Sequence, residues 1–409
     1  MNRDKDFLLK VSNTFCMFPW VHLNIAPNGN VHPCCVGVSS DPLGKITKDV
    51  TFDDIINNEN YKELRNNMLA NKPSNACSAC YDLEKFGNSF REYANESLGH
   101  LIDEVLEKTD GDGTIHDFKM RYFDIRFRNI CNFKCRTCGP DYSSSWALEE
   151  NRHTLSKHKI HDLSSNTNIL EEFLTHIPHV ELVYFAGGEP LITDEHYTIL
   201  EKLIESNRTD VKLRYNSNCS VLSYKDKDLL SLWKHFDQIE VSASIDHIGE
   251  RAEYIRHGTD WAVIDKNLKI LRDLPNIVLS VNSVLSIFNY QTLDMLIEYL
   301  IENNMLAPTT WHSTIIPTSY PSYFSATVLP TENKLIGTSK LVNLLDKMKS
   351  DGFVDSQTGM IQNSIDFANS ADNWEKEKEN LIREITKKDI HRNESFVKTF
   401  PELAKLLDM

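Results

Sequence analysis

The sequence has no long hydrophobic run and a deficit of positive charge. No stretch approaches 18 consecutive apolar residues, so we expect no membrane span. The 44 lysines and arginines stand against 59 aspartates and glutamates, which gives a net charge of −15. Proteins that bind nucleic acids usually present a basic face, so we expect no direct nucleic-acid binding, although nucleotide substrates are compatible with this charge. The first residues, MNRDKDFLLK, lack the apolar core of a signal peptide.

A disulfide framework is also lacking, because nine cysteines are an odd number in a long chain without an export signal. We therefore expect a cytoplasmic protein in a reducing environment. Seven cysteines fall into two groups, Cys16, Cys34, Cys77 and Cys80 in the first and Cys131, Cys135 and Cys138 in the second. Cys35 and Cys219 are left over. The spacing within the groups is typical of metal ligands, so metal–thiolate chemistry is expected.

The pattern of residues divides the chain into three parts. Residues 1–115 carry turn signals and one amphipathic stretch, 52–69, and close on a glycine-rich break at 110–113 that predicts a linker. Residues 116–325 alternate strands with helices, which predicts βαβ units and a parallel sheet. Residues 326–409 are helical and charged, and there we favour a solvated helix face over a specific contact surface.

The central part predicts an α/β fold. Six strands are expected, at 121–127, 181–185, 212–216, 239–245, 277–285 and 309–316. Helices are expected between them, among others at 196–206, 261–274 and 292–303. Six repeats with little additional sequence favour a partial (βα)6 TIM-like barrel over an open sheet with helices on both faces.

The second cysteine group follows directly on the first of these strands. Three thiolates in one tight loop, from Cys131, Cys135 and Cys138, can hold three irons of a 4Fe–4S cubane and leave the fourth iron open. A compact zinc site would need a fourth ligand, and the closest downstream histidine, His153, is too distant in the sequence. The spacing therefore predicts an iron–sulfur cluster with one iron that a substrate can chelate.

This CxxxCxxC segment resembles the cluster motif of the radical S-adenosylmethionine (SAM) superfamily. The resemblance implies that SAM chelates the open iron and is cleaved reductively to a 5′-deoxyadenosyl radical, which abstracts hydrogen from a substrate. Other motifs follow in the family's order. The cofactor-binding residues that the resemblance implies are Gly187, Gly188, Glu189, Pro190, Asn218, Ser244, Asp246, Arg256 and Asn282.

The resemblance also assigns roles to several of these residues. The run from Gly187 to Pro190 resembles the GGEP loop that binds the methionyl amino group. Ser244 and Asp246 resemble a pair that contacts the ribose, and Arg256 matches an arginine that pairs with the methionyl carboxylate. Thr137 stands where the family usually has an aromatic residue, so the adenine contact must come from elsewhere.

The first cysteine group predicts a second metal site. Four cysteines can fill a tetrahedral zinc site or a fully ligated 4Fe–4S cluster, and spacing alone slightly favours zinc. Glycine and proline turns around Cys34 predict a β-hairpin that presents this ligand. The pattern of Cys16, Gly29 and Cys34 resembles the start of a SPASM or twitch extension. This resemblance implies an auxiliary 4Fe–4S cluster, in a module placed before the barrel instead of after it.

Two cysteines are too few for another auxiliary cluster. Cys35 competes with Cys34 as a ligand, and the spacing from the preceding glycine favours Cys34. Cys219 is interpreted as a core residue in preference to a hydrogen donor. The resemblance further implies an external electron donor of the flavodoxin or ferredoxin type. The substrate class stays open between a peptide or protein side chain, a small molecule and a nucleotide, and a non-catalytic zinc or iron–sulfur protein is the alternative.

Overall fold

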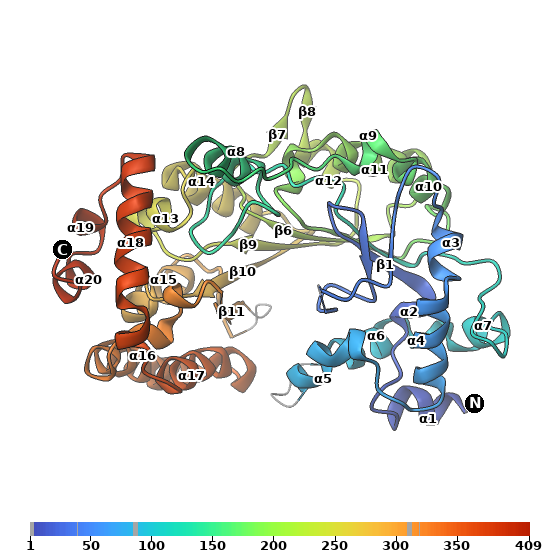
Figure 1. Ribbon diagram of the computed structural model, residues 1–409, viewed down its shortest axis with the longest axis horizontal. Helices are drawn as coiled ribbons and strands as arrows, with labels where there is room; N and C mark the ends of the chain where they lie inside the picture. The colour runs from blue at the N-terminus through green and yellow to red at the C-terminus, as the bar shows by residue number, and fades with distance from the viewer. Residues whose placement is uncertain (1–3, 39, 85–88, 309–312, 319) are drawn as a thin grey trace. The chain divides into compact units, whose positions relative to one another are not determined.

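The computed structural model describes residues 4–38, 40–84, 89–308, 313–318 and 320–409 (Figure 1). The chain forms two compact units. The first comprises Met1–Ile130, Lys159–Arg214 and Ser231–Asp237, and the second comprises Cys131–His158, Tyr215–Leu230 and Gln238–Met409. Within the described residues, no helix combines the length and the hydrophobicity that crossing a membrane requires.

In the first unit, a hairpin from the N-terminal part joins a parallel sheet. β1 (His22–Ile25) pairs in parallel with β4 (Tyr122–Ile125) and antiparallel with β2 (Asn30–His32). β4 also pairs in parallel with β5 (Leu182–Phe185), and β2 pairs antiparallel with β3 (Gly44–Lys45). The strand order in this unit is β5-β4-β1-β2-β3. The hairpin predicted from the glycine and proline turns is confirmed.

Short helices make up most of the rest of the first unit. They are α1 (Lys5–Lys10), α2 (Phe18–Val21), α3 (Phe52–Ile56), α4 (Glu59–Leu69), α5 (Ser78–Glu84), α6 (Phe90–Leu98), α7 (Ile102–Glu107), α9 (Leu163–Asn166), α10 (Ile169–Thr175) and α11 (Asp194–Glu205). The amphipathic stretch 52–69 is two helices and not one. The break arises because the Asn58 side chain accepts the Tyr61 N–H and so starts α4 anew.

The glycine-rich segment 110–113 is not a linker, and our prediction was wrong here. Gly113 has a φ of 88°, and a Cβ at this position would lie 2.7 Å from the carbonyl oxygen of Lys62 on α4. Arg65, whose side chain is fully buried, donates to the Gly113 carbonyl at 2.7 Å. A buried guanidinium requires hydrogen-bond acceptors, and this turn supplies one, so the segment folds back onto α4.

The second unit continues the alternation of strands and helices. β9 (Ile239–Ser244), β10 (Ile277–Leu285) and β11 (Thr314–Pro317) pair in parallel. β6 (Lys212–Ser217) is divided between the two units. Along β10, every second residue from Ile277 is buried and the others are half-buried, so the strand has one fully covered face and one partly open face. The six predicted strands are confirmed where they are described; positions 309–312 of the last one lie outside the described residues.

The helices of the second unit fall into two groups. Those around the strands are α8 (Ser144–His153), α13 (Gly249–Ile255), α14 (Trp261–Arg272) and α15 (Leu293–Glu302), with α12 (Leu229–Trp233) shared with the first unit and a small β7–β8 hairpin (Ser223–Tyr224, Lys227–Asp228). The C-terminal group is α16 (Thr331–Ser350), α17 (Asp355–Asn369), α18 (Trp374–Arg392), α19 (Phe396–Thr399) and α20 (Pro401–Leu406). α16 and α17 lie side by side (Figure 1). The α/β class with a parallel sheet and a helical C-terminal part is confirmed.

Candidate functional site

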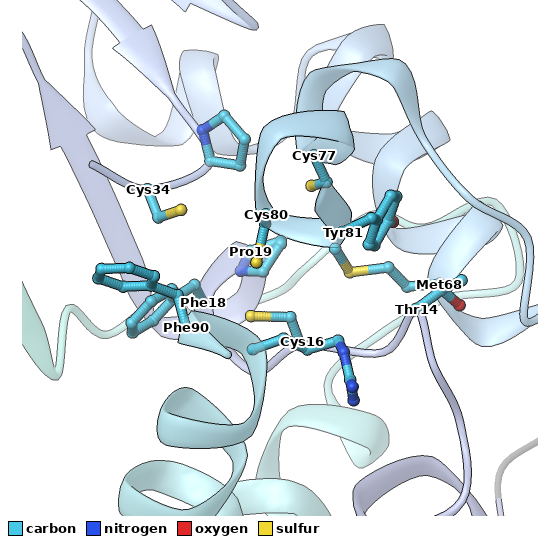
Figure 2. A pocket seen from close by; sticks show the side chains of 12 residues that line it. Thr14, Cys16, Phe18, Pro19, Cys34, Met68, Cys77, Cys80, Tyr81 and Phe90 are labelled. Atoms are coloured by element: carbon cyan, nitrogen blue, oxygen red, sulfur yellow. The ribbon is translucent and has the colours of Figure 1, made fainter. Parts of the chain in front are cut away.

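Four cysteines of the N-terminal part line one cavity (Figure 2). Cys16 lies just before α2, Cys34 follows β2, Cys77 ends a short helical turn and Cys80 lies in α5. All four are buried and line the same cavity, together with aromatic and other apolar side chains. The structure therefore brings together the four residues that the sequence grouped.

Burial keeps these thiols protonated when no metal is bound. It raises the pKa of Cys77 to about 12, and the neighbouring Cys80 adds to this rise, while a hydrogen bond from Tyr81 opposes it. It also raises the pKa values of Cys16 and Cys34 well above that of a free thiol. A metal that replaces these protons would couple its binding to proton release.

The donor set fits a metal–thiolate site. Four buried thiolates can ligate a 4Fe–4S cubane at all four irons or a single zinc ion. Among the described residues, no set of three histidine, cysteine, aspartate or glutamate side chains is arranged to hold a single metal ion.

The two remaining cysteines lie apart from this cavity. Cys34 lines the cavity, whereas Cys35 is exposed and lies near the charged groups of Asp124 and Arg126. Cys219 is fully buried at the end of β6, as expected for a core residue.

Cys131, Cys135 and Cys138 lie on a single loop ahead of α8. The Ser145 hydroxyl donates to the Cys131 carbonyl at 2.7 Å, and the Trp146 indole N–H donates to the Cys135 carbonyl at 2.7 Å. The Cys138 N–H donates to the Cys135 carbonyl at 3.1 Å, which closes a turn between these two ligands. The start of α8 thus fixes the loop backbone, and Cys138 remains exposed.

Arg256 is directed at this loop. Its Nη1 lies 3.8 Å from Cys135 Sγ, while Nε and Nη2 each lie 2.9 Å from the Asp246 carboxylate. Asp246 is fully buried and also accepts the Val284 N–H at 2.7 Å. Burial raises the pKa of Cys135 to about 12, and Arg256 opposes this rise. The arginine therefore stabilises negative charge at the cysteine loop.

The other predicted residues of the second unit lie at strand ends. The Asn218 side chain, after β6, donates to Asn132 Oδ1 in the cysteine loop at 2.9 Å. Ser244 is opposite Asn282 in the pairing of β9 with β10. The Asn282 side chain also donates to Asn216 Oδ1 at 3.2 Å. The structure thus places these residues in the same unit as the three cysteines.

The glycine-rich loop after β5 packs on the chain immediately before Cys131. The Glu189 N–H donates to the Ile130 carbonyl at 2.7 Å, and a Cβ at Gly188 would lie 2.0 Å from the same oxygen. The buried Glu189 carboxylate accepts the Leu191 N–H at 3.1 Å and caps the turn that begins at Pro190. Gly188 is therefore constrained by the backbone of its own chain.

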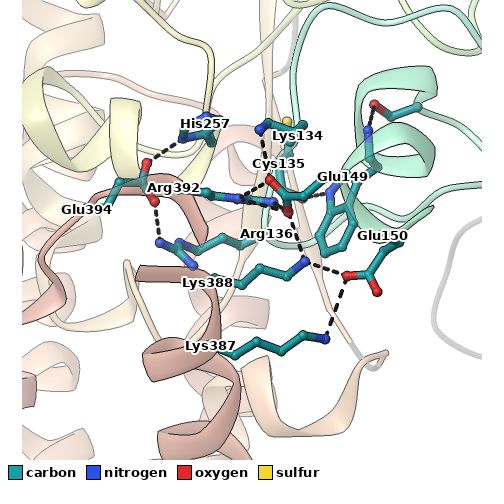
Figure 3. Close-up of polar contacts among 12 residues, drawn as sticks. Lys134, Cys135, Arg136, Glu149, Glu150, His257, Lys387, Lys388, Arg392 and Glu394 are labelled. Atoms are coloured by element: carbon teal, nitrogen blue, oxygen red, sulfur yellow. Dashed lines mark hydrogen bonds and ion pairs between the residues drawn. The ribbon is translucent and has the colours of Figure 1, made fainter. Parts of the chain in front are cut away.

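Sequence reasoning missed the partners of the cations in the cysteine loop. Arg136 lies 3.2 Å from Asp389. It also lies 2.6 Å from Glu394, and Lys134 lies 2.8 Å from Glu149 (Figure 3). Asp389 and Glu394 belong to the C-terminal part, where a solvated helix face was predicted. That prediction was wrong for this end of α18. Nothing in the local spacing indicated the contact between Arg136 and Asp389, because these two residues are 253 positions apart in the sequence.

Comparisons with known proteins agree with the motifs. A family model described as an iron–sulfur cluster-binding domain, SPASM, matches residues 16–81, and the model of the radical SAM superfamily matches residues 125–300. No curated protein matches the sequence.

Three of the solved structures that match this chain have low sequence identity to it. "Native anSMEcpe with bound AdoMet" is 18% identical, with a TM-score of 0.39 over 56% of this chain and 61% of that one. Streptococcus suis SuiB bound to S-adenosylmethionine is 12% identical, with a TM-score of 0.38 over 80% and 69%. SuiB bound to the precursor peptide SuiA is 12% identical, with a TM-score of 0.36 over 67% and 60%. The chain spans about 60% of the length of the first matched chains.

The cofactors of the matched domains are a 4Fe–4S cluster with SAM in one and an auxiliary iron–sulfur cluster in the other. The two cysteine groups lie within the two matched ranges, in the order that the sequence indicated. Residues 125–300 thus match the radical SAM superfamily, and the match to the SPASM iron–sulfur cluster-binding domain precedes that region.

Proposed function

We propose that this protein is an enzyme that cleaves SAM reductively and uses the resulting radical to abstract a hydrogen atom from a substrate. The observation that carries the proposal is the Arg256–Asp246 pair beside Cys135. A cluster that served only the fold would need no guanidinium at its edge. The carboxylate of SAM, bound at the open iron, would need such a partner, because arginine recognises carboxylates with two parallel hydrogen bonds.

The residues of the chain bind and orient the reactants, while the cluster, when bound, supplies the electron. Asp246 fixes the plane of the Arg256 guanidinium and leaves Nη1 facing the cysteine loop. We assign the loop from Gly187 to Pro190 to the methionyl amino group, and Ser244 to the ribose. Asn218 and Asn282 are assigned to the remaining polar contacts with SAM; the full set of SAM-binding residues proposed here is Gly187, Gly188, Glu189, Pro190, Asn218, Ser244, Asp246, Arg256 and Asn282.

The N-terminal part would hold the auxiliary cluster. We assign Cys16, Cys34, Cys77 and Cys80 as its ligands, because all four line one cavity. Such a cluster has no iron left for a substrate, so its role would be electron transfer or stabilisation of the fold. We retain the division into residues 1–115, 116–325 and 326–409, a cytoplasmic location and an external donor of the flavodoxin or ferredoxin type.

As the substrate we propose a peptide or protein side chain. The side chains on the half-buried face of β9 and β10 include Ser242 and Ser280, whose hydroxyls lie 3.0 Å apart. These groups are neutral, and neutral donors and acceptors suit the amides of a peptide. The phosphates of a nucleotide favour cationic partners, which makes a nucleotide or another small molecule the alternative.

Anaerobic reconstitution with iron and sulfide tests the proposal. Two cubanes correspond to about eight irons per chain, and the reduced protein should convert SAM to 5′-deoxyadenosine and methionine. Alanine at Cys131, Cys135 or Cys138 should abolish this conversion, whereas Cys35→Ala, the matched control, should preserve it. Conversion that survived in any of the three variants would refute the site. About four irons with one zinc would refute the auxiliary cluster alone.

A further inference from the structure

Part of the cysteine loop runs side by side with another segment of the second unit. The loop part is residues 133–138, and the other segment is residues 254–258, which contains Arg256. The Lys134 N–H donates to the His257 carbonyl and the Arg136 N–H donates to the Ile255 carbonyl, both at 2.8 Å. Cys135 and Arg256 therefore occupy the middle of an antiparallel pairing.

Arg136 attaches this pairing to the C-terminal helix. Its side chain is 2% exposed, and Nη2 lies 3.2 Å from the Asp389 carboxylate and 2.6 Å from that of Glu394. The guanidinium also lies over the Tyr254 ring, at 3.6 Å from its centre. A buried cation without such partners is strongly unfavourable, so the position of Arg136 depends on the two carboxylates.

Each of the two carboxylates also contacts a side chain of residues 254–258. The Tyr254 hydroxyl donates to Asp389 Oδ1 at 2.7 Å. His257 Nδ1 lies 2.6 Å from Glu394 Oε1 (Figure 3). Asp389 and Glu394 thus bridge residues 133–138 to residues 254–258 from one side.

Further ion pairs anchor α18, the helix that carries Asp389 and ends two residues before Glu394. Lys388 and Arg392 of α18 each lie 2.9 Å from Glu149 on α8, which also binds Lys134. Glu149 is 5% exposed. α18 is therefore bonded both to the cysteine loop and to the helix that follows the loop.

We propose that the end of α18 and the two residues that follow it form a clamp that sets the spacing between Cys135 and Arg256. Asp389 and Glu394 are the positioning residues for SAM binding in this clamp. The inference rests on the proposed function, in which one end of SAM binds the cluster and Arg256 binds its carboxylate. Every residue next to Cys135 and Arg256 in the chain takes part in the pairing or in the clamp. A change in their spacing would weaken SAM binding without removing any ligand of the cluster.

The test uses three variants: Asp389→Asn, Glu394→Gln and the double variant that combines these two substitutions. Each is compared with the control variant Glu379→Gln. Glu379 lies on the same helix, is exposed and undergoes the same chemical change, so it is a matched control. SAM affinity is measured on the full, anaerobically reconstituted protein by titrating the EPR spectrum of the reduced cluster with SAM. The dissociation constant should rise at least about tenfold in the double variant, the size of one lost charge-assisted hydrogen bond. Iron content and circular dichroism should match the wild type, and Glu379→Gln should bind SAM normally.

The outcomes separate the clamp from the proposed function. Wild-type SAM affinity in a folded, iron-loaded double variant would overturn the clamp alone. If the double variant does not fold, the single variants decide, since each retains one bridging carboxylate; unchanged affinity in both would overturn the clamp. A wild-type protein that holds iron at the three cysteines and binds no SAM would overturn both proposals.

Discussion

The contact between Gly188 and the chain before Cys131 leaves no room for a methyl group. In Gly188→Ala, the new Cβ would lie 2.0 Å from the Ile130 oxygen, 2.6 Å from the Ile130 carbonyl carbon and 3.0 Å from the Asn129 carbonyl carbon. All three are backbone atoms, which cannot rotate away as the end of a side chain can. The loop after β5 must therefore move until these atoms reach ordinary contact at 3.4–4 Å.

The energetic consequence follows from the bonds that this movement breaks. The hydrogen bond from the Glu189 N–H to the Ile130 carbonyl, now 2.7 Å long, would be lost. Such a bond contributes about 0.5–1.5 kcal/mol, and overpacking a closely packed position costs about 1–3 kcal/mol. We expect the free energy of unfolding of Gly188→Ala to fall by about 2–4 kcal/mol.

Urea unfolding of the metal-free protein, followed by circular dichroism, measures this effect. Gly139→Ala is the matched control, because a Cβ at Gly139 would meet nothing within 4 Å although the residue directly follows Cys138. Its free energy of unfolding should stay within about 0.5 kcal/mol of the wild type. An unfolding midpoint of Gly188→Ala equal to that of the wild type would refute the packing described here.

Glu149→Gln should lower the free energy of unfolding by about 3 kcal/mol at pH 7, because it leaves three cations around a neutral group. Burial alone would raise the pKa of Glu149, but hydrogen bonds from Arg392, Lys134 and Lys388 hold it well below 4.5. The difference in free energy of unfolding between the wild type and Glu149→Gln is therefore full above pH 4.5 and shrinks as the pH falls toward the folded-state pKa. A difference that is undiminished at about pH 3 in urea titrations would contradict this. Cys34→Ser should lose about four irons per reconstituted chain, whereas Cys35→Ser should keep them; equal iron contents would overturn the choice of ligand. Tyr81→Phe should make the reduction potential of the auxiliary cluster more negative, because a hydrogen bond to the Cys77 sulfur is lost. EPR-monitored redox titration would show this, and an unchanged potential would mean that the hydroxyl does not tune the cluster.

Local patterns were sufficient to predict the strands, several helices and the two cysteine groups. β10 alternates buried and half-buried residues with a period of two along Ile277–Leu285, the range predicted for it. α14 begins at the predicted residue because the Asp260 side chain accepts the Val263 N–H. The cysteine spacings needed no tertiary information, because the ligands of one loop are close in the sequence. All of these depend on interactions between residues a few positions apart.

Only the tertiary structure decided which distant groups meet. It directed Cys34 toward the other three cysteines and Cys35 toward Asp124 and Arg126, although the two are adjacent in the sequence. It turned a glycine-rich segment into an acceptor for the buried Arg65, and it brought the carboxylates of Asp389 and Glu394 to Arg136. A charged residue has the same local signature whether it faces water or a distant partner, and the partner is determined by how the helices pack. The motif therefore identified the cysteine loop, and the packing of α18 determined what holds it.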